Sequence, residues 1–377
     1  MDPIAHTFTG MALAAAGLRR ATPLAATALF MGVNAPDVDV LSGLGAEYEA
    51  LAFRRGWTHG VLALALWPFV LTGVLLAWDR YVRSKRKPGA APARAGPLLA
   101  LTALAVLTHP TLDWLNNYGL RWLMPFDGTW FYGDALFVID PWFWLLAGGA
   151  AFLTFSRSRL AKVRWAVFFA LATALIVASA ATALSNAAEA VPAAAAVLWV
   201  AGVAGLVAAR WRLRAASPAT LERAAQAGLA LAALYVVALI AASGAARNEV
   251  RETARARGVA VEDVMVAPRP ANPFVGDVVV ATRDEYYVGR FDWLAAPRAS
   301  FEQAPVPRAS GAAFQLAAQA LAARRFLTWA RYPAVDVERG PSGSTLVRFT
   351  DVRYRAADRL SGPVVELPAG AVETSGD

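Results

Sequence analysis

The chain has 377 residues, of which 57% are hydrophobic and 17% are charged, and it contains no cysteine. Soluble globular proteins carry about a quarter charged residues, so this composition is typical of a membrane protein. It also excludes disulfides and thiolate metal sites. The net charge of +8 raises the alternative of nucleic-acid binding. The basic residues, however, fall in short loops between apolar segments, which favours a positive-inside membrane topology with lipids, and not nucleic acid, as partners.

Two short apolar segments begin the chain, at residues 4–18 and 22–36, and they meet at Arg19-Arg20. Fifteen helical residues reach only about 22 Å, whereas the hydrocarbon core of a bilayer is about 30 Å thick. The segments therefore form either two short spans or a re-entrant hairpin. No basic n-region precedes them, so we expect no cleaved signal peptide. Clearer spans are predicted at residues 60–78, 97–115, 141–155, 164–184, 193–209 and 228–246.

The loops between these segments alternate in charge. Up to residue 246, one set of loops contains sixteen lysines and arginines, and the other set contains three, Arg54, Arg55 and Arg121. Loops rich in Lys and Arg stay in the cytoplasm. The sequence therefore predicts a multi-pass protein of the bacterial inner (plasma) membrane, with its histidines on the periplasmic, outer side.

The composition changes near residue 247, where charged residues become common and apolar runs shrink to strand length. A helix is predicted at residues 312–332, and Pro341-Ser342-Gly343 predicts a turn between two strands. The predicted strands are residues 277–282, 285–291, 334–338, 344–349 and 364–367.

The predicted fold class is thus an all-α polytopic membrane helix bundle of about six to eight spans, with a small C-terminal α+β soluble domain. We expect three parts: a membrane-embedded domain at residues 1–156, additional transmembrane helices at 157–246, and an extracytoplasmic α+β domain at 247–377. The positive-inside pattern exports the last part to the outer side.

All of the histidines lie near acidic residues at the ends of apolar segments, on the predicted outer side. Ionisable groups are costly in or near hydrocarbon, so such a gathering indicates a functional site. Imidazole and carboxylate ligands without cysteine are typical of a zinc site or a two-metal hydrolytic site. The candidate ligands are His6, Asp37, Asp39, His59, His109 and Asp113.

The sharpest local motif is the segment Thr108–Gly119. On a helix, His109 and Asp113 are four residues apart and share one face, with Asn116 about one turn further along. The pair can share a metal, or the carboxylate can orient the imidazole. The alternative is a satisfied polar pair inside a helix bundle.

Asp37 and Asp39 follow Pro36, where we expect an extended or turning chain. One of these carboxylates then ligates a metal while the other accepts a hydrogen bond from a neighbour, or Asp37 or Asp39 caps a helix or turn. Arg54 and Arg55 precede His59, and guanidinium groups beside a metal suit phosphate recognition. Their alternative role is contact with anionic lipid headgroups. Asp140 before Pro141 predicts a helix N-cap.

Several segments resemble, in order, the bacterial YdjM/YbcI-like family of inner-membrane proteins, which are described as metal-dependent hydrolases. They are MDPIAHTFTG, NAPDVDVL, RRGWTHG, LTHPTLDWLNNYG and PFDGTWFYGDALFVIDPWFW, followed by ANPFVGDVVVATRDEYYVG and TDVRYR. The resemblance implies metal-assisted hydrolysis at the six candidate ligands, without fixing the substrate.

Three hypotheses follow. In the first, one or two Zn²⁺ ions activate water for attack on a phosphoester or acyl group of a lipid-linked substrate. Asp39 and Asp113 are then the catalytic carboxylates, and Arg54, Arg55 and Asn116 contact substrate. In the second, the same residues bind a cation or relay protons in a transporter. In the third, the exported domain binds a partner and the histidines are dispensable.

Overall fold

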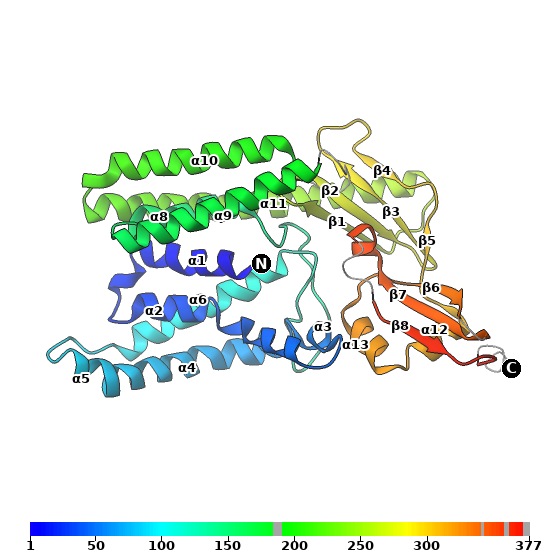
Figure 1. Cartoon of the computed structure of the whole chain (residues 1–377), viewed down its shortest axis with the longest axis horizontal. Helices are drawn as coiled ribbons and strands as arrows, with labels where there is room; N and C mark the ends of the chain where they lie inside the picture. The colour runs from blue at the N-terminus through cyan, green and yellow to red at the C-terminus, as the bar shows by residue number, and fades with distance from the viewer. Residues whose placement is uncertain (184–190, 341–342, 358–361, 372–377) are drawn as a thin grey trace. The chain divides into compact units, whose positions relative to one another are not determined.

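The computed structural model describes residues 1–183, 191–340, 343–357 and 362–371 (Figure 1). The chain divides into two compact units. The first contains Met1–Val38, Arg55–Ala241 and Arg269–Pro273, and the second contains Asp39–Arg54, Ala242–Pro268 and Phe274–Asp377.

Five helices are long and apolar enough to cross a membrane, and a sixth apolar helix, Pro141–Phe155, is shorter. The prediction of a multi-pass helical membrane protein with a C-terminal sheet region is therefore confirmed. The five are Val61–Arg86, Ala95–Trp114, Arg159–Ala181, Ala193–Arg212 and Pro218–Ala256.

The first unit is made of helices that lie side by side in Figure 1. α1 and α2 are short, as predicted, and η1 joins them. Their bounds, with those of the helices that follow, are α1 Pro3–Ala15, η1 Leu18–Arg20, α2 Ala25–Gly32, α4 Val61–Trp78, η3 Asp79–Arg83, α5 Ser84–Arg86, α6 Ala95–Trp114, α7 Pro141–Phe143, η4 Trp144–Gly148, α8 Gly149–Phe155, α9 Arg159–Ala183, α10 Ala193–Arg212, η5 Leu213–Ala215 and α11 Pro218–Ala256.

α11 is 39 residues long, about twice the predicted span at residues 228–246. The hydropathy pattern detected only the apolar middle of this helix. The flanks are rich in Ala, Glu and Arg, which are strong helix formers, so the helix continues through them. It ends at Ala256, shortly before Gly258, whose φ of +80° is left-handed.

Side-chain caps fix the starts of two helices. Asp2 accepts hydrogen bonds from the backbone N–H groups of Ile4 and Ala5 at the start of α1. Asp140 accepts one from the N–H of Phe143, 2.7 Å away, which confirms the predicted N-cap before Pro141. Asp140 also accepts a hydrogen bond from the hydroxyl of Tyr235, so the cap links α7 to α11.

The second unit contains two antiparallel sheets. In the first, the strand order is β1-β2-β3-β4, with β5 also paired to β3, and in the second it is β6-β7-β8. The strands are β1 Asp263–Arg269, β2 Asn272–Ala281, β3 Glu285–Asp292, β4 Ala299–Phe301, β5 Val306–Pro307, β6 Pro333–Arg339, β7 Thr345–Asp351 and β8 Val364–Leu367. Short helical segments complete it: η2 Ala35–Leu44, which begins in the first unit, α3 Glu49–Phe53, α12 Gly311–Ala317, α13 Leu321–Trp329 and η7 Val352–Ala357.

The five predicted strands correspond to β2, β3, β6, β7 and β8, whereas β1, β4 and β5 were missed. The predicted turn at Pro341-Ser342-Gly343 lies partly outside the described residues. Its strands pair in an antiparallel register with Val337 opposite Val347.

The single helix predicted at residues 312–332 is wrong, because the chain forms α12 and α13 with a break between them. Ala320 is extended there, with ψ of 140°. The two helices pack on different partners, α12 on β7 and β8, and α13 on α3. The break contains no Gly or Pro, so tertiary packing overrides the local helix propensity.

In the first unit, α2 packs tightly against α6. A Cβ atom at Gly32 would lie 2.5 Å from the Cβ of Ala105 and 3.3 Å from the carbonyl oxygen of Thr102. Only glycine therefore permits this approach. The same helix α6 bonds to α4 through the buried hydroxyls of Thr72 and Thr102, 3.0 Å apart.

We predict that Gly32→Ala destabilises the protein, by about 1–3 kcal/mol, because the new methyl group overpacks the interface between α2 and α6. Thermal unfolding of the detergent-purified protein measures the effect. Gly73→Ala in α4 is the matched control, since no atom lies within 4 Å of its added Cβ. Equal unfolding temperatures for the two variants would contradict the close packing.

Candidate metal centre

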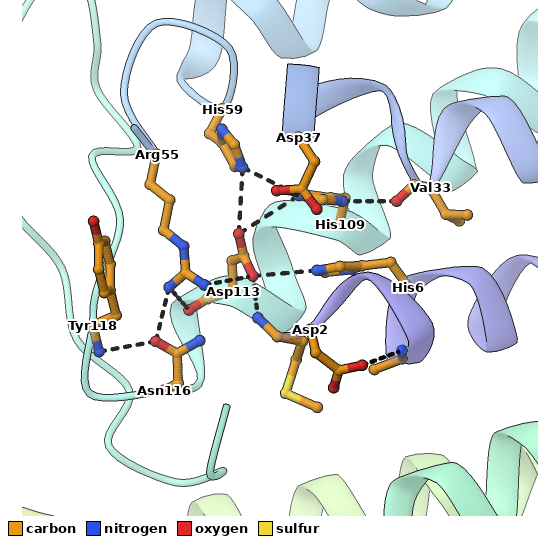
Figure 2. A network of polar contacts seen from close by, with 12 residues as sticks. Asp2, His6, Val33, Asp37, Arg55, His59, His109, Asp113, Asn116 and Tyr118 are labelled. Carbon is orange, nitrogen blue, oxygen red and sulfur yellow. Dashed lines mark hydrogen bonds and ion pairs between the residues drawn. The ribbon is translucent and has the colours of Figure 1, made fainter. Parts of the chain in front are cut away.

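Four side chains from three parts of the first unit converge on one point, and we call them the His/Asp cluster. Their ligand atoms all lie within 4.8 Å of one another. Asp37 comes from η2, His59 from the turn before α4, and His109 and Asp113 from one face of α6. Figure 2 shows these side chains pointing toward one another, with His6 of α1 beside them.

The shortest distances in the cluster join imidazole nitrogens and carboxylate oxygens. His59 Nε2 lies 3.1 Å from His109 Nε2. Asp113 Oδ2 lies 3.3 Å from His59 Nε2 and 3.5 Å from His109 Nε2. Asp37 Oδ1 is 3.8 Å from His109 Nε2. The three histidines and Asp113 are buried, whereas the Asp37 side chain is 19% exposed.

A main-chain contact orients the imidazole of His109. Its Nδ1 lies 2.7 Å from the carbonyl oxygen of Val33. A carbonyl oxygen only accepts hydrogen bonds, so Nδ1 carries the proton and donates it there. The Nε2 atom then presents a lone pair to the cluster. This is the arrangement in which protein imidazoles bind metals.

The imidazole of His59 has a comparable contact on its outer nitrogen. His59 Nδ1 lies 2.8 Å from the hydroxyl of Thr58. A hydroxyl can accept a proton from Nδ1 or donate its own proton to it. When it accepts, His59 Nε2 faces the cluster without a proton, as His109 Nε2 does; when it donates, His59 Nε2 carries the proton and can donate it to His109 Nε2. Two lone-pair nitrogens 3.1 Å apart repel each other unless a proton or a cation lies between them.

Asp113 adds negative charge at the same point. Its Oδ2 atom is buried and accepts no hydrogen bond, although it faces the two imidazoles. An unsatisfied buried carboxylate oxygen is costly. A cation bound between Oδ2 and the two Nε2 atoms removes this cost, so the donor set of the cluster fits a divalent metal.

The other oxygen of Asp113 is held by protein groups. His6 Nε2 lies 3.3 Å from Oδ1, and the amino group of Met1 also contacts it. The ring of His6 stacks on that of His109, with centroids 3.7 Å apart. His6 therefore supports the carboxylate and one imidazole from the side of α1.

Arg55 makes the most extensive set of contacts to Asp113 and its neighbours. Arg55 Nη2 lies 3.1 Å from Asp113 Oδ1. Arg55 Nη1 donates to Asn116 Oδ1 at 2.8 Å and to the Gly119 carbonyl at 3.3 Å. The guanidinium also lies over the ring of Tyr118. Arg55 has a left-handed φ of +54°, and this buried geometry favours positioning of Asp113.

Asp39 and Arg54 belong to the second unit, and Asp39 is not a member of the His/Asp cluster. Its Oδ1 atom lies 3.4 Å from Arg54 Nε. The 3₁₀ turns of η2 account for the divergence of the two aspartates. Such a helix has three residues per turn, so Asp37 and Asp39 project in different directions. Roles of Asp39 and Arg54 in a metal site remain predictions.

The comparisons with known proteins agree with the membrane fold. Residues 1–186 match a family described as YdjM inner membrane protein. The uncharacterized protein YfhP of Bacillus subtilis (strain 168) is 25% identical over 174 residues, which is 41% of this chain and 49% of YfhP. The chain thus spans about half the length of this curated relative. No solved structure matches the chain. The matched residues 1–186 contain the whole His/Asp cluster, so the similarity to the YdjM inner membrane protein family includes the candidate metal centre.

Proposed function

We propose that the protein is a membrane-bound, metal-dependent hydrolase that cleaves a phosphoester or acyl ester of a lipid-linked or envelope substrate. One observation carries this proposal. Two imidazole nitrogens and an unsatisfied carboxylate oxygen, all buried, lie 3.1–3.5 Å from one another.

These spacings match the ligand shell of zinc. Two ligand atoms that are each about 2.0–2.1 Å from Zn²⁺ at a tetrahedral angle are about 3.3 Å apart. We assign His59 Nε2, His109 Nε2 and Asp113 Oδ2 as the ligands. Three protein ligands with a fourth, open position are the usual arrangement of a catalytic zinc site.

Asp37 Oδ1 lies 3.8 Å from His109 Nε2, and Asp37 is the most exposed member of the cluster. A bound Zn²⁺ ion lowers the pKa of water to about 7. We propose that Asp37 accepts the proton of the attacking water as general base. The water oxygen bonds to the phosphorus or acyl carbon, the ester bond breaks, and the leaving alcohol takes a proton.

A lipidic substrate suits the surroundings of the site. A cavity of about 670 Å³ runs along α1, and its lining residues Ile4 and Thr7 flank His6 in the sequence. The rest of its wall is mainly apolar and includes Phe8, Trp165 and Phe168. Such a wall favours an acyl or prenyl chain whose ester end lies near the His/Asp cluster.

The proposed membrane topology of the protein follows from the charge of its loops. Because the basic loops stay in the cytoplasm, the His/Asp cluster and residues 247–377 lie on the periplasmic side. Residues 1–156 then form the hydrolase domain, and residues 157–246 supply additional transmembrane helices.

The first test is metal content. We predict about one divalent metal ion per chain after purification in detergent at neutral pH, because three ligands are already oriented. His109→Ala and Asp113→Asn each remove one ligand and should lower bound metal at least tenfold, measured by inductively coupled plasma mass spectrometry. Asp79→Asn is the matched control, since Asp79 is also buried but pairs with Arg83. Wild-type protein without metal would refute the proposal.

Arg55 provides a test of the supporting contacts. Arg55→Lys keeps the charge but cannot reach Asp113, Asn116 and the Gly119 carbonyl together. We predict a decrease in metal affinity of roughly 10–100-fold, the range typical of groups that orient metal ligands. Competition with a chromophoric chelator measures it. Arg20→Lys, whose wild-type residue pairs with Glu222, should keep wild-type affinity, and an equal loss in both variants would contradict the assignment.

The second test separates a hydrolase from an ion-binding protein. Asp37→Asn should retain metal but lose about 100-fold or more in kcat on a phosphodiester or lipid ester substrate, because a general base contributes that much. Asp39→Asn is the informative comparison. If Asp39→Asn loses turnover and Asp37→Asn does not, the general base is Asp39. If the wild-type protein binds metal but hydrolyses none of the tested esters, the transporter hypothesis is favoured.

A further inference from the structure

A second cavity lies at the end of the first unit that is remote from the His/Asp cluster. Its volume is about 630 Å³. It is formed where α8 ends, α9 begins, and α10 ends. The lining residues are Phe152, Ser156, Arg157, Lys162, Trp165, Ala166, Phe169, Val207, Arg210, Trp211 and Arg214.

The polar part of this wall is cationic. Four basic residues line the cavity, and none of its described lining residues is acidic. Within the described part of the chain, none of the four forms an ion pair with a carboxylate. Arg210 Nε donates to the hydroxyl of Ser156 at 2.9 Å, and Arg214 lies over the ring of Trp211. Four like charges around one cavity favour an anion there. They are Arg157, Lys162, Arg210 and Arg214.

The remaining wall is apolar. Phe152, Trp165 and Phe169 line it together with Val207 of α10. A small inorganic anion is not stabilised by contact with such an apolar surface, whereas burial of an acyl chain against it is energetically favourable. The ligand that matches both parts has a phosphate head and a hydrocarbon tail.

The position of the cavity agrees with such a ligand. Lys162 lies near the start of the candidate span Arg159–Ala181, and Arg210 lies near the end of Ala193–Arg212. Residues at the ends of spans lie at the level of lipid headgroups. Basic pockets between transmembrane helices bind anionic headgroups in this zone.

We propose that this cavity is a binding site for an anionic phospholipid. Its phosphate contacts the side chains of Lys162 and Arg210, and an acyl chain lies along Phe152 and Phe169. The cavity shares no residue with the His/Asp cluster and only Trp165 with the cavity along α1, so the proposal does not depend on the assigned metal ligands.

The test compares two double variants of the full chain. Lys162→Gln with Arg210→Gln removes two cations of the cavity, one from α9 and one from α10. Arg159→Gln with Arg212→Gln removes two cations from the same helices that do not line it. Native mass spectrometry then measures retention of phosphatidylglycerol and of phosphatidylcholine with the same acyl chains, titrated into the detergent-solubilised protein.

We expect wild-type protein and the Arg159/Arg212 variant to retain phosphatidylglycerol in preference to phosphatidylcholine. The Lys162/Arg210 variant should bind phosphatidylglycerol at least tenfold more weakly, because each cation near the headgroup contributes about 1 kcal/mol, roughly fivefold in affinity. Lys162→Gln alone, at an exposed position, should show a smaller loss of about fivefold. It keeps the proposal testable if the double variant does not fold.

Two results would overturn the proposal. Equal loss in both double variants would mean that the charge acts non-specifically at the membrane surface. Displacement of phosphatidylglycerol by millimolar inorganic phosphate, with no difference between lipids, would mean that the site binds phosphate alone. Unfolding temperatures in lipid-free detergent show whether each variant is folded before its affinity is interpreted.

Discussion

The arrangement of the His/Asp cluster depends on the carboxylate of Asp113, whose two oxygens face different surroundings. Oδ1 is held by His6, the Met1 amino group and Arg55, whereas Oδ2 faces the imidazoles of His59 and His109 without a hydrogen bond. The cationic groups on Oδ1 fix the position of the carboxylate. Because its position is fixed, the second oxygen cannot turn away from the imidazole lone pairs, and the protein accepts a buried polar arrangement that a cation would complete.

The packing of α2 and the chemistry of His109 are coupled through the main chain. Carbonyl groups at the end of a helix have no partner within it, and Val33 directly follows α2. Its carbonyl is therefore available for His109 Nδ1. The contact requires α2 to approach α6 closely, which Gly32 permits at Ala105. A fold contact that lies outside the cluster thus sets the tautomer of an imidazole in the candidate metal centre.

The sequence predicted the parts of the structure that follow from local patterns. Long apolar runs predicted the long helices, short apolar runs predicted five of the strands, and the spacing of His109 and Asp113 placed both on one face of α6. Hydropathy patterns did not predict the break at Ala320, because tertiary packing decides it. They did not predict the polar flanks of α11 either, because helix propensity extends that helix. The gathering of the histidines was anticipated from loop charge, but their contacts were not. The contact of His109 with the Val33 carbonyl involves a main-chain group, which no residue type reveals. Arg55 was predicted to contact a phosphate or lipid headgroups, whereas its side chain is buried against Asp113 and Asn116.

The first unit separates two kinds of polar group at its two ends. One end holds the His/Asp cluster, in which Arg55 and the Met1 amino group contact Asp113 Oδ1 while Oδ2 accepts no hydrogen bond. The other end holds Arg157, Lys162, Arg210 and Arg214 without acidic partners among the described residues. The apolar length of the helices keeps the two sets of polar groups apart, so neither set pairs with the other within the protein. The bundle therefore presents a candidate site for a cation at one end and the proposed site for an anionic phospholipid at the other.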